Sequence, residues 1–155
     1  MPDLSVATEA PVWQFRARVL AMMASLLACS MIAIFTVIWV RLPDESKETF
    51  TVFQRLTLLL FSAIILWVLY RMATLRVVAY DEGLTIRNVF RSYRLEWSDI
   101  AALRFKPGDA WLQLFDREGT RLGILAVQAS DGPRANAAAK HLATIARSHG
   151  AGKSP

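Results

Sequence analysis

VLAMMASLLACSMIAIFTVIWV, which runs from Val19 to Val40, contains no charged side chain. At a rise of about 1.5 Å per residue, a helix of this length extends about 33 Å. The hydrocarbon core of a bilayer is about 30 Å thick, so one such helix is long enough to cross it. The sequence therefore predicts a membrane-spanning helix, and the rest of the chain is expected to work at a membrane surface.

A second apolar run follows after a short loop. Residues 56–70 are uncharged, but about 22 Å of helix is too short to cross a bilayer. The run reaches spanning length if it starts at Phe50 and if Arg55 extends its side chain to the interface. A buried core helix of a soluble domain is the alternative. A short loop that returns directly from another span favours a transmembrane hairpin.

The chain divides into four parts by composition. Residues 71–155 contain 13 Lys and Arg against 8 Asp and Glu, which accounts for the whole net charge of +5. Lys and Arg beside the spans barely discriminate between orientations, but a strongly basic domain favours the inside of the membrane, so we expect both termini in the cytoplasm. The predicted parts are an N-terminal tail (1–15), a two-span hairpin (16–74, spans about 19–40 and 50–71), a β-rich domain (75–148) and a disordered tail (149–155).

Cys29 is the only cysteine, which excludes an internal disulfide. Residues 26–29 resemble a lipoprotein lipobox, but the apolar run continues beyond Cys29, where a lipoprotein has a polar tether. Small residues at every fourth position allow close approach of another helix. This candidate packing stripe consists of Ala21, Ser25, Cys29 and Ala33. Its partner is either the second span of the same chain or a second protomer, which would make a homo-oligomer.

The domain after the hairpin has the pattern of antiparallel strands. Apolar and polar residues alternate in short segments up to Val127, separated by turn residues, which indicates six strands in about fifty residues. Apolar residues at helical spacing follow Pro133. We therefore predict an α+β domain, an antiparallel β-meander or barrel of about six strands with one C-terminal α-helix.

Three segments of this domain carry a family resemblance. DEGLTIRN (81–88), LEWSDI (95–100) and LAVQASDG (125–132) resemble the bacterial PH domains of actinobacterial membrane proteins, typified by the low molecular weight protein antigen 6 group. The likeness covers about residues 75–147 and the preceding two-span hairpin. It implies a PH-like fold at the membrane and little about activity.

The first hairpin loop departs from the PH domains that bind phosphoinositides, which have a basic loop there. Here the loop is Asp81-Glu82-Gly83, which would repel a phosphate. Phosphoinositide recognition at this loop is therefore not expected.

Alternate turns of the meander should lie near the membrane and far from it. The far turns are rich in acids, whereas the near turns and the connection to the second span are basic, which suits anionic head groups. The candidate lipid-facing residues are Arg71, Arg76, Arg91, Arg94 and Lys106. Ordinary solvated turn residues are the alternative interpretation.

No catalytic constellation is recognisable in the sequence. His141 and His149 lie eight residues apart without a cysteine or paired carboxylates, so no metal site is expected. No glycine-rich phosphate loop is present, and we expect no enzyme activity and no cofactor. The pI near 9.9 is not accompanied by a basic helix or an aromatic-basic motif, so nucleic acid is not an expected partner.

Two functions fit these observations. The first is a membrane-anchored interaction module on the inner leaflet, which recruits or organises a protein partner of unknown identity. The second is a structural subunit of a membrane protein complex, assembled through the small-residue face of the first span.

Overall fold

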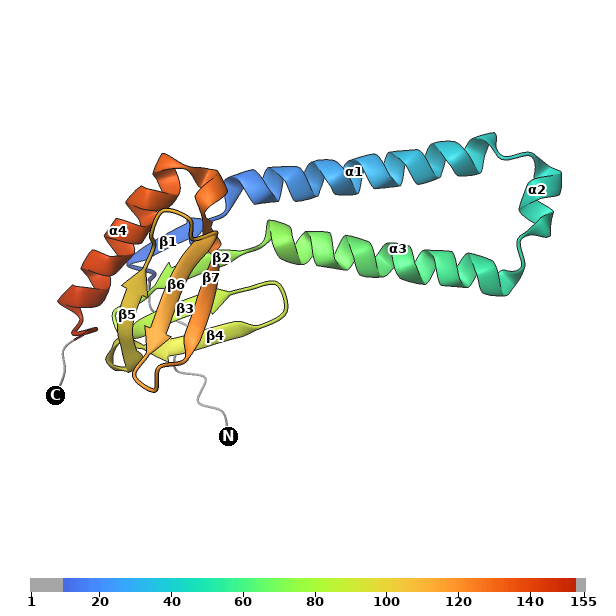
Figure 1. Ribbon diagram of the computed structural model, residues 1–155. Coiled ribbons are helices and arrows are strands. Elements are labelled where there is room, and N and C mark those ends of the chain that lie inside the picture. The colour runs from blue at the N-terminus through green and yellow to red at the C-terminus, as the bar shows by residue number, and fades with distance from the viewer. Residues whose placement is uncertain (1–9, 153–155) are drawn as a thin grey trace.

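Two long helices leave one end of the β-domain side by side in the computed structural model, which describes residues 10–152 (Figure 1). These helices are α1 (Arg18–Arg41) and α3 (Val52–Ala73), and a short helix, α2 (Asp44–Thr49), joins them. Thr51 begins α3 as a capping box with Gln54, so this helix lies two residues later than predicted.

The two long helices expose their apolar side chains. Ala24 is the one buried residue of α1, and Leu69 is the one buried residue of α3. A core helix of a soluble domain would bury a continuous apolar face, so that interpretation of the second apolar run is wrong. Both helices are long and apolar enough to cross a membrane.

A short strand before α1 belongs to the β-domain. This strand, β1 (Trp13–Arg16), pairs antiparallel with β2 (Arg76–Ala79) and places Phe15 opposite Val77. The sequence predicts an N-terminal tail over residues 1–15, whereas the structure places residues 13–15 in this strand. Four residues give too short an alternation to detect, and their pairing partner follows only after both helices. The helical hairpin is therefore inserted between the first two strands of one domain.

The remaining strands complete two antiparallel sheets. The four-stranded sheet has the order β1-β2-β3-β4, and the three-stranded sheet has the order β5-β6-β7. Six strands follow the hairpin, as predicted, and β1 is the additional strand. The bounds are β3 (Gly83–Arg87), β4 (Ser92–Glu96), β5 (Ile100–Arg104), β6 (Trp111–Asp116) and β7 (Arg121–Gln128).

The C-terminal helix α4 (Pro133–Ser148) closes the core. Four of the six buried residues on its inward face are alanines, and the other two are Leu142 and Ile145, so the helix packs closely on the sheets. The core combines this face with the inward residues of both sheets, of which the largest fully buried ones are Leu75, Leu84, Ile86, Ile100, Leu112, Leu114 and Ile124.

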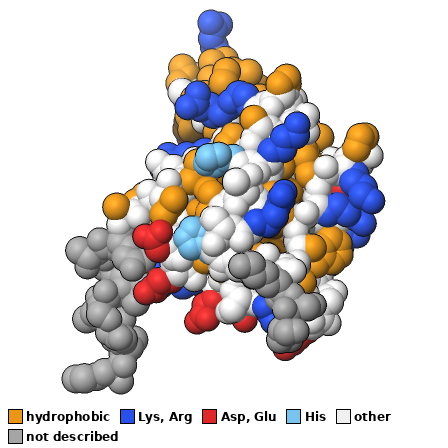
Figure 2. Space-filling view, turned by 90° about the vertical axis from the view of Figure 1, so that its left-hand side faces the viewer, with side chains coloured by type: hydrophobic (Ala, Val, Ile, Leu, Met, Phe, Trp, Pro, Cys, Tyr) orange, Lys and Arg blue, Asp and Glu red, His pale blue; other side chains and the backbone are white. Residues whose placement is uncertain are grey.

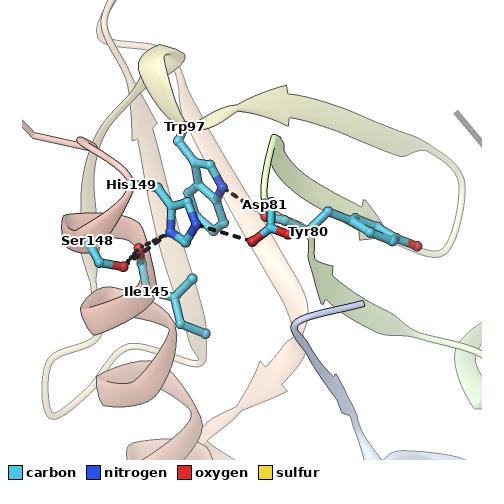
Figure 3. A network of polar contacts seen from close by, with 6 residues as sticks. All are labelled: Tyr80, Asp81, Trp97, Ile145, Ser148 and His149. Carbon is cyan, nitrogen blue, oxygen red and sulfur yellow. Dashed lines mark hydrogen bonds and ion pairs between the residues drawn. The ribbon is translucent and has the colours of Figure 1, made fainter. Parts of the chain in front are cut away.

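The end of α4 is connected to the first hairpin turn (Figure 3). The His149 ring stacks on Trp97 with 5.4 Å between ring centroids, and its Nε2 lies 3.6 Å from Asp81 Oδ1. The Trp97 indole donates a hydrogen bond to the Tyr80 carbonyl at 3.0 Å. The structure therefore places His149, the first residue of the predicted disordered tail (149–155), against the domain, and residues 153–155 of that tail lie outside the described residues. The chain is still in contact at Gly152, whose N–H donates to the Ile100 carbonyl.

Asn88 joins the two sheets and is 8% exposed. Its side-chain Nδ2 donates to the Gly123 carbonyl at 2.7 Å, and its Oδ1 accepts from the Leu125 N–H at 3.2 Å. A carboxamide is suited to this position because it provides one donor and one acceptor.

Replacing Asn88 by alanine should lower the free energy of unfolding by about 2–4 kcal/mol, because a buried N–H and a buried carbonyl lose their partners. Asn136→Ala, at an exposed position of α4, should change it by less than about 0.5 kcal/mol. Urea unfolding of the detergent-solubilised chain, followed by near-ultraviolet circular dichroism, measures both variants. Equal stability of the two variants would contradict a bridging role for Asn88.

Candidate functional site

The turn between β3 and β4 lies against the last turns of α3 (Figure 1). Arg71 donates from Nε to the Val89 carbonyl at 2.5 Å and from Nη2 to the Asn88 carbonyl at 3.0 Å. The Phe90 ring lies 6.4 Å from the Trp67 ring, and Phe90 is 73% exposed. Arg71, a candidate lipid-facing residue, therefore holds this turn on α3.

The structure distributes the other candidate lipid-facing residues over the domain. Arg91 is exposed beside Phe90, and Arg76 is the first residue of β2. Arg94 lies in the middle of β4 and lines a hollow of about 690 Å³ together with Glu82 and Glu96. Lys106 lies in the β5–β6 turn, where its backbone N–H donates to Asp109 Oδ2 at 2.8 Å. Their contact with lipid stays a prediction.

The face of the domain that points away from the long helices has mixed charge (Figure 2). Acidic side chains gather along its lower part, and Lys and Arg side chains lie beside α4. The turns between strands predict an acidic surface at this end of the domain. The structure shows that α4 adds the exposed Lys140 and Arg147 to it. The two histidines of α4 and its end pack on aromatic rings, His141 on Trp13 and His149 on Trp97.

A groove lies between α4 and the edge of β5. Among the described strands, β5 pairs with β6 alone, and its other edge faces α4. The Gly152 N–H occupies the Ile100 carbonyl at the start of this edge, and the edge is open beyond that contact. Two hollows of about 280 and 400 Å³ adjoin there and share Leu103, Ala143 and Arg147 as lining residues. Apart from the small residues of α4, no pattern in the sequence indicates this groove, because it arises from how α4 lies against the sheet.

Asp131 connects the domain to the first long helix. It lies in the 3₁₀-helix η3 (Ala129–Asp131), is 7% exposed, and its Oδ1 accepts a hydrogen bond from the Val19 N–H at 3.3 Å. Arg134 Nη1 lies 4.0 Å from the same oxygen. A carboxylate at a helix N-terminus is favourable. The structure therefore places the Asp131 carboxylate at the start of α1.

The candidate packing stripe on α1 is only partly covered. Ala21 is half-buried, whereas Ser25, Cys29 and Ala33 are exposed. The buried position of α1 is Ala24, with half-buried alanines three residues before it and four residues after it. The second span therefore does not cover most of the predicted stripe.

Sheets of four and three antiparallel strands with one C-terminal helix define a PH-like domain. Residues 74–143 match the model of the bacterial PH domain family. No curated protein and no solved structure matches the chain. The finer resemblance to the actinobacterial antigen 6 group stays a prediction. Between residues 10 and 152, no three His, Cys, Asp or Glu side chains are placed to hold a metal ion.

Proposed function

We propose that this protein is a non-catalytic, membrane-anchored interaction module. In this proposal α1 and α3 span the cell membrane, both termini lie in the cytoplasm, and the PH domain recruits a protein partner at the inner leaflet. The exposed apolar surfaces of the two helices support membrane insertion, because contact of such large apolar surfaces with water is unfavourable. Lipoprotein processing before Cys29 is disfavoured, since it would remove β1 from the domain.

The open edge of β5 beside α4 is the observation that carries the proposal. An extended peptide can add a strand to such an edge, and its side chains then enter the adjoining groove. Leu103 and Ala143 provide an apolar lining, and Lys140 and Arg147 provide positive charge. We therefore expect the partner to contribute an extended, acidic segment.

Ala143→Arg should reduce capture of this partner at least about tenfold, because a long charged side chain fills the groove. The matched control is Ala137→Arg, the same substitution at an exposed position of α4 that lines neither hollow. Capture is measured by crosslinking in native membranes and quantitative mass spectrometry of proteins attached to the full chain. Thermal unfolding of both variants verifies that the domain is folded.

The same experiment separates the two functions. Capture that survives Ala143→Arg but is lost in Cys29→Phe would contradict the groove and support a structural subunit assembled through α1. Cys29 is exposed on the face of α1 that the second span leaves uncovered. A large side chain there blocks close helix approach.

A further inference from the structure

A row of three arginines crosses one face of the four-stranded sheet. Arg16 of β1 lies opposite Arg76 of β2, which in turn lies opposite Arg87 of β3. Directly opposite residues of antiparallel strands project from the same face, with Cβ atoms about 5 Å apart. The three guanidinium groups, here called the arginine row, therefore leave the sheet side by side.

The arginine row faces away from the core. The adjacent position of each strand is Phe15, Val77 or Ile86, and the last two of these are 0% exposed. Successive residues of a strand point to opposite faces, so the arginines project outward. The next outward positions also lack an acid: they are Gln14, Val78, Thr85 and Arg94.

Among the described residues, the arginine row has no counter-charge. Within residues 10–152, none of its three side chains forms an ion pair or a hydrogen bond with another residue. Like charges directly opposite each other destabilise a sheet. A bound anion would remove this repulsion, and a phosphate fits a guanidinium group because it accepts two parallel hydrogen bonds.

The arginine row lies at the end of the sheet where both long helices begin and end. Arg16 is two residues before the start of α1, and Arg76 is three residues after the end of α3. A strand advances about 3.3 Å per residue, so the row lies within roughly 10 Å of the helix ends. The contact between Phe90 and Trp67 places the neighbouring β3–β4 turn at the same level. Such aromatic residues are typical of the membrane interface.

We propose that the arginine row binds the phosphate group of an anionic lipid at the membrane surface. The acidic turn at Asp81 and Glu82 lies at the opposite end of β2, so the proposed site is separate from the first hairpin loop. This inference rests on the proposal that α1 and α3 span the membrane, but it does not depend on partner capture at the β5 edge.

The test uses the full chain in a non-ionic detergent, titrated with phosphatidylglycerol or with phosphatidylcholine, with bound lipid counted by native mass spectrometry. The wild type should retain phosphatidylglycerol in preference to phosphatidylcholine. The variant Arg16→Gln/Arg76→Gln/Arg87→Gln should bind phosphatidylglycerol at least about tenfold more weakly, because charge-assisted contacts to the phosphate are lost. Replacing the same residues by lysine keeps the charge but removes the bidentate hydrogen bonds that a guanidinium group donates to a phosphate. The lysine variant should therefore bind phosphatidylglycerol with intermediate affinity.

The matched control is Arg104→Gln/Arg117→Gln/Arg121→Gln, which removes the same charge at exposed positions outside the row and outside the β5 groove. It should bind phosphatidylglycerol like the wild type. An equal loss in this control would show that net charge alone attracts lipid, and would overturn the site. Displacement of the lipid by millimolar inorganic phosphate would also overturn it, in favour of a small-anion site. If the glutamine variant does not fold, wild-type binding by the lysine variant overturns the proposed geometry.

Discussion

A chain in which Asn-Gly replaces residues 18–74 should fold as a soluble β-domain, whereas residues 75–155 alone should not. The long helices separate β1 from β2 in the sequence, but Arg16 and Arg76 lie opposite each other in the sheet. A two-residue turn between Ala17 and Leu75 therefore continues the existing register as a hairpin. Without β1, the buried residues Leu75 and Val77 lose part of their covering, and the small core loses a strand.

Thermal unfolding followed by circular dichroism, with amide dispersion in a proton–nitrogen NMR spectrum, measures both chains. In the fused chain, Phe15→Asp should destabilise the domain by about 3 kcal/mol or more, because a charge enters the core face of β1. Gln14→Asp, on the exposed face of the same strand, should cost less than about 0.5 kcal/mol. Cooperative unfolding of residues 75–155 alone, at the temperature of the fused chain, would contradict an essential β1.

The full chain should remain in the membrane pellet after a carbonate wash at high pH, and the fused chain without the helices should appear in the supernatant. Carbonate removes peripheral proteins, whereas a spanning helix stays because its backbone hydrogen bonds are satisfied within lipid. The exposed apolar side chains of α1 and α3 add a large transfer free energy to this retention.

Quantitative immunoblotting of pellet and supernatant measures the distribution. The fused chain is a close control because it retains the same domain and most of the same basic residues. Release of the full chain into the wash would contradict membrane insertion. Retention of the fused chain would instead show that the domain itself holds the membrane strongly, which would assign the anchoring to the β-domain.

Local features of the sequence predicted both long helices and the six strands after them. The length of an uncharged apolar run and the alternation within a strand are properties of neighbouring residues, so they can be read without knowing the fold. The same holds for the helical spacing that follows Pro133. The order of these elements predicted an α+β domain with one C-terminal helix, and the resemblance of three segments to bacterial PH domains implied the PH-like fold.

Pairings between distant residues required the tertiary structure. In the sequence Arg16 precedes the first long helix and Arg76 follows the second, and only the strand register sets them side by side with Arg87. The hydrogen bond between Asp131 and the Val19 N–H joins residues that are far apart in the sequence. The β5 groove likewise depends on the packing of α4 against a distant strand. The amino-acid sequence alone thus determined which segments become helices and strands, because helix and strand preferences depend on neighbouring residues. Which charged side chains meet was decided by the fold, because hydrogen-bond register and packing bring together residues that no sequence window contains.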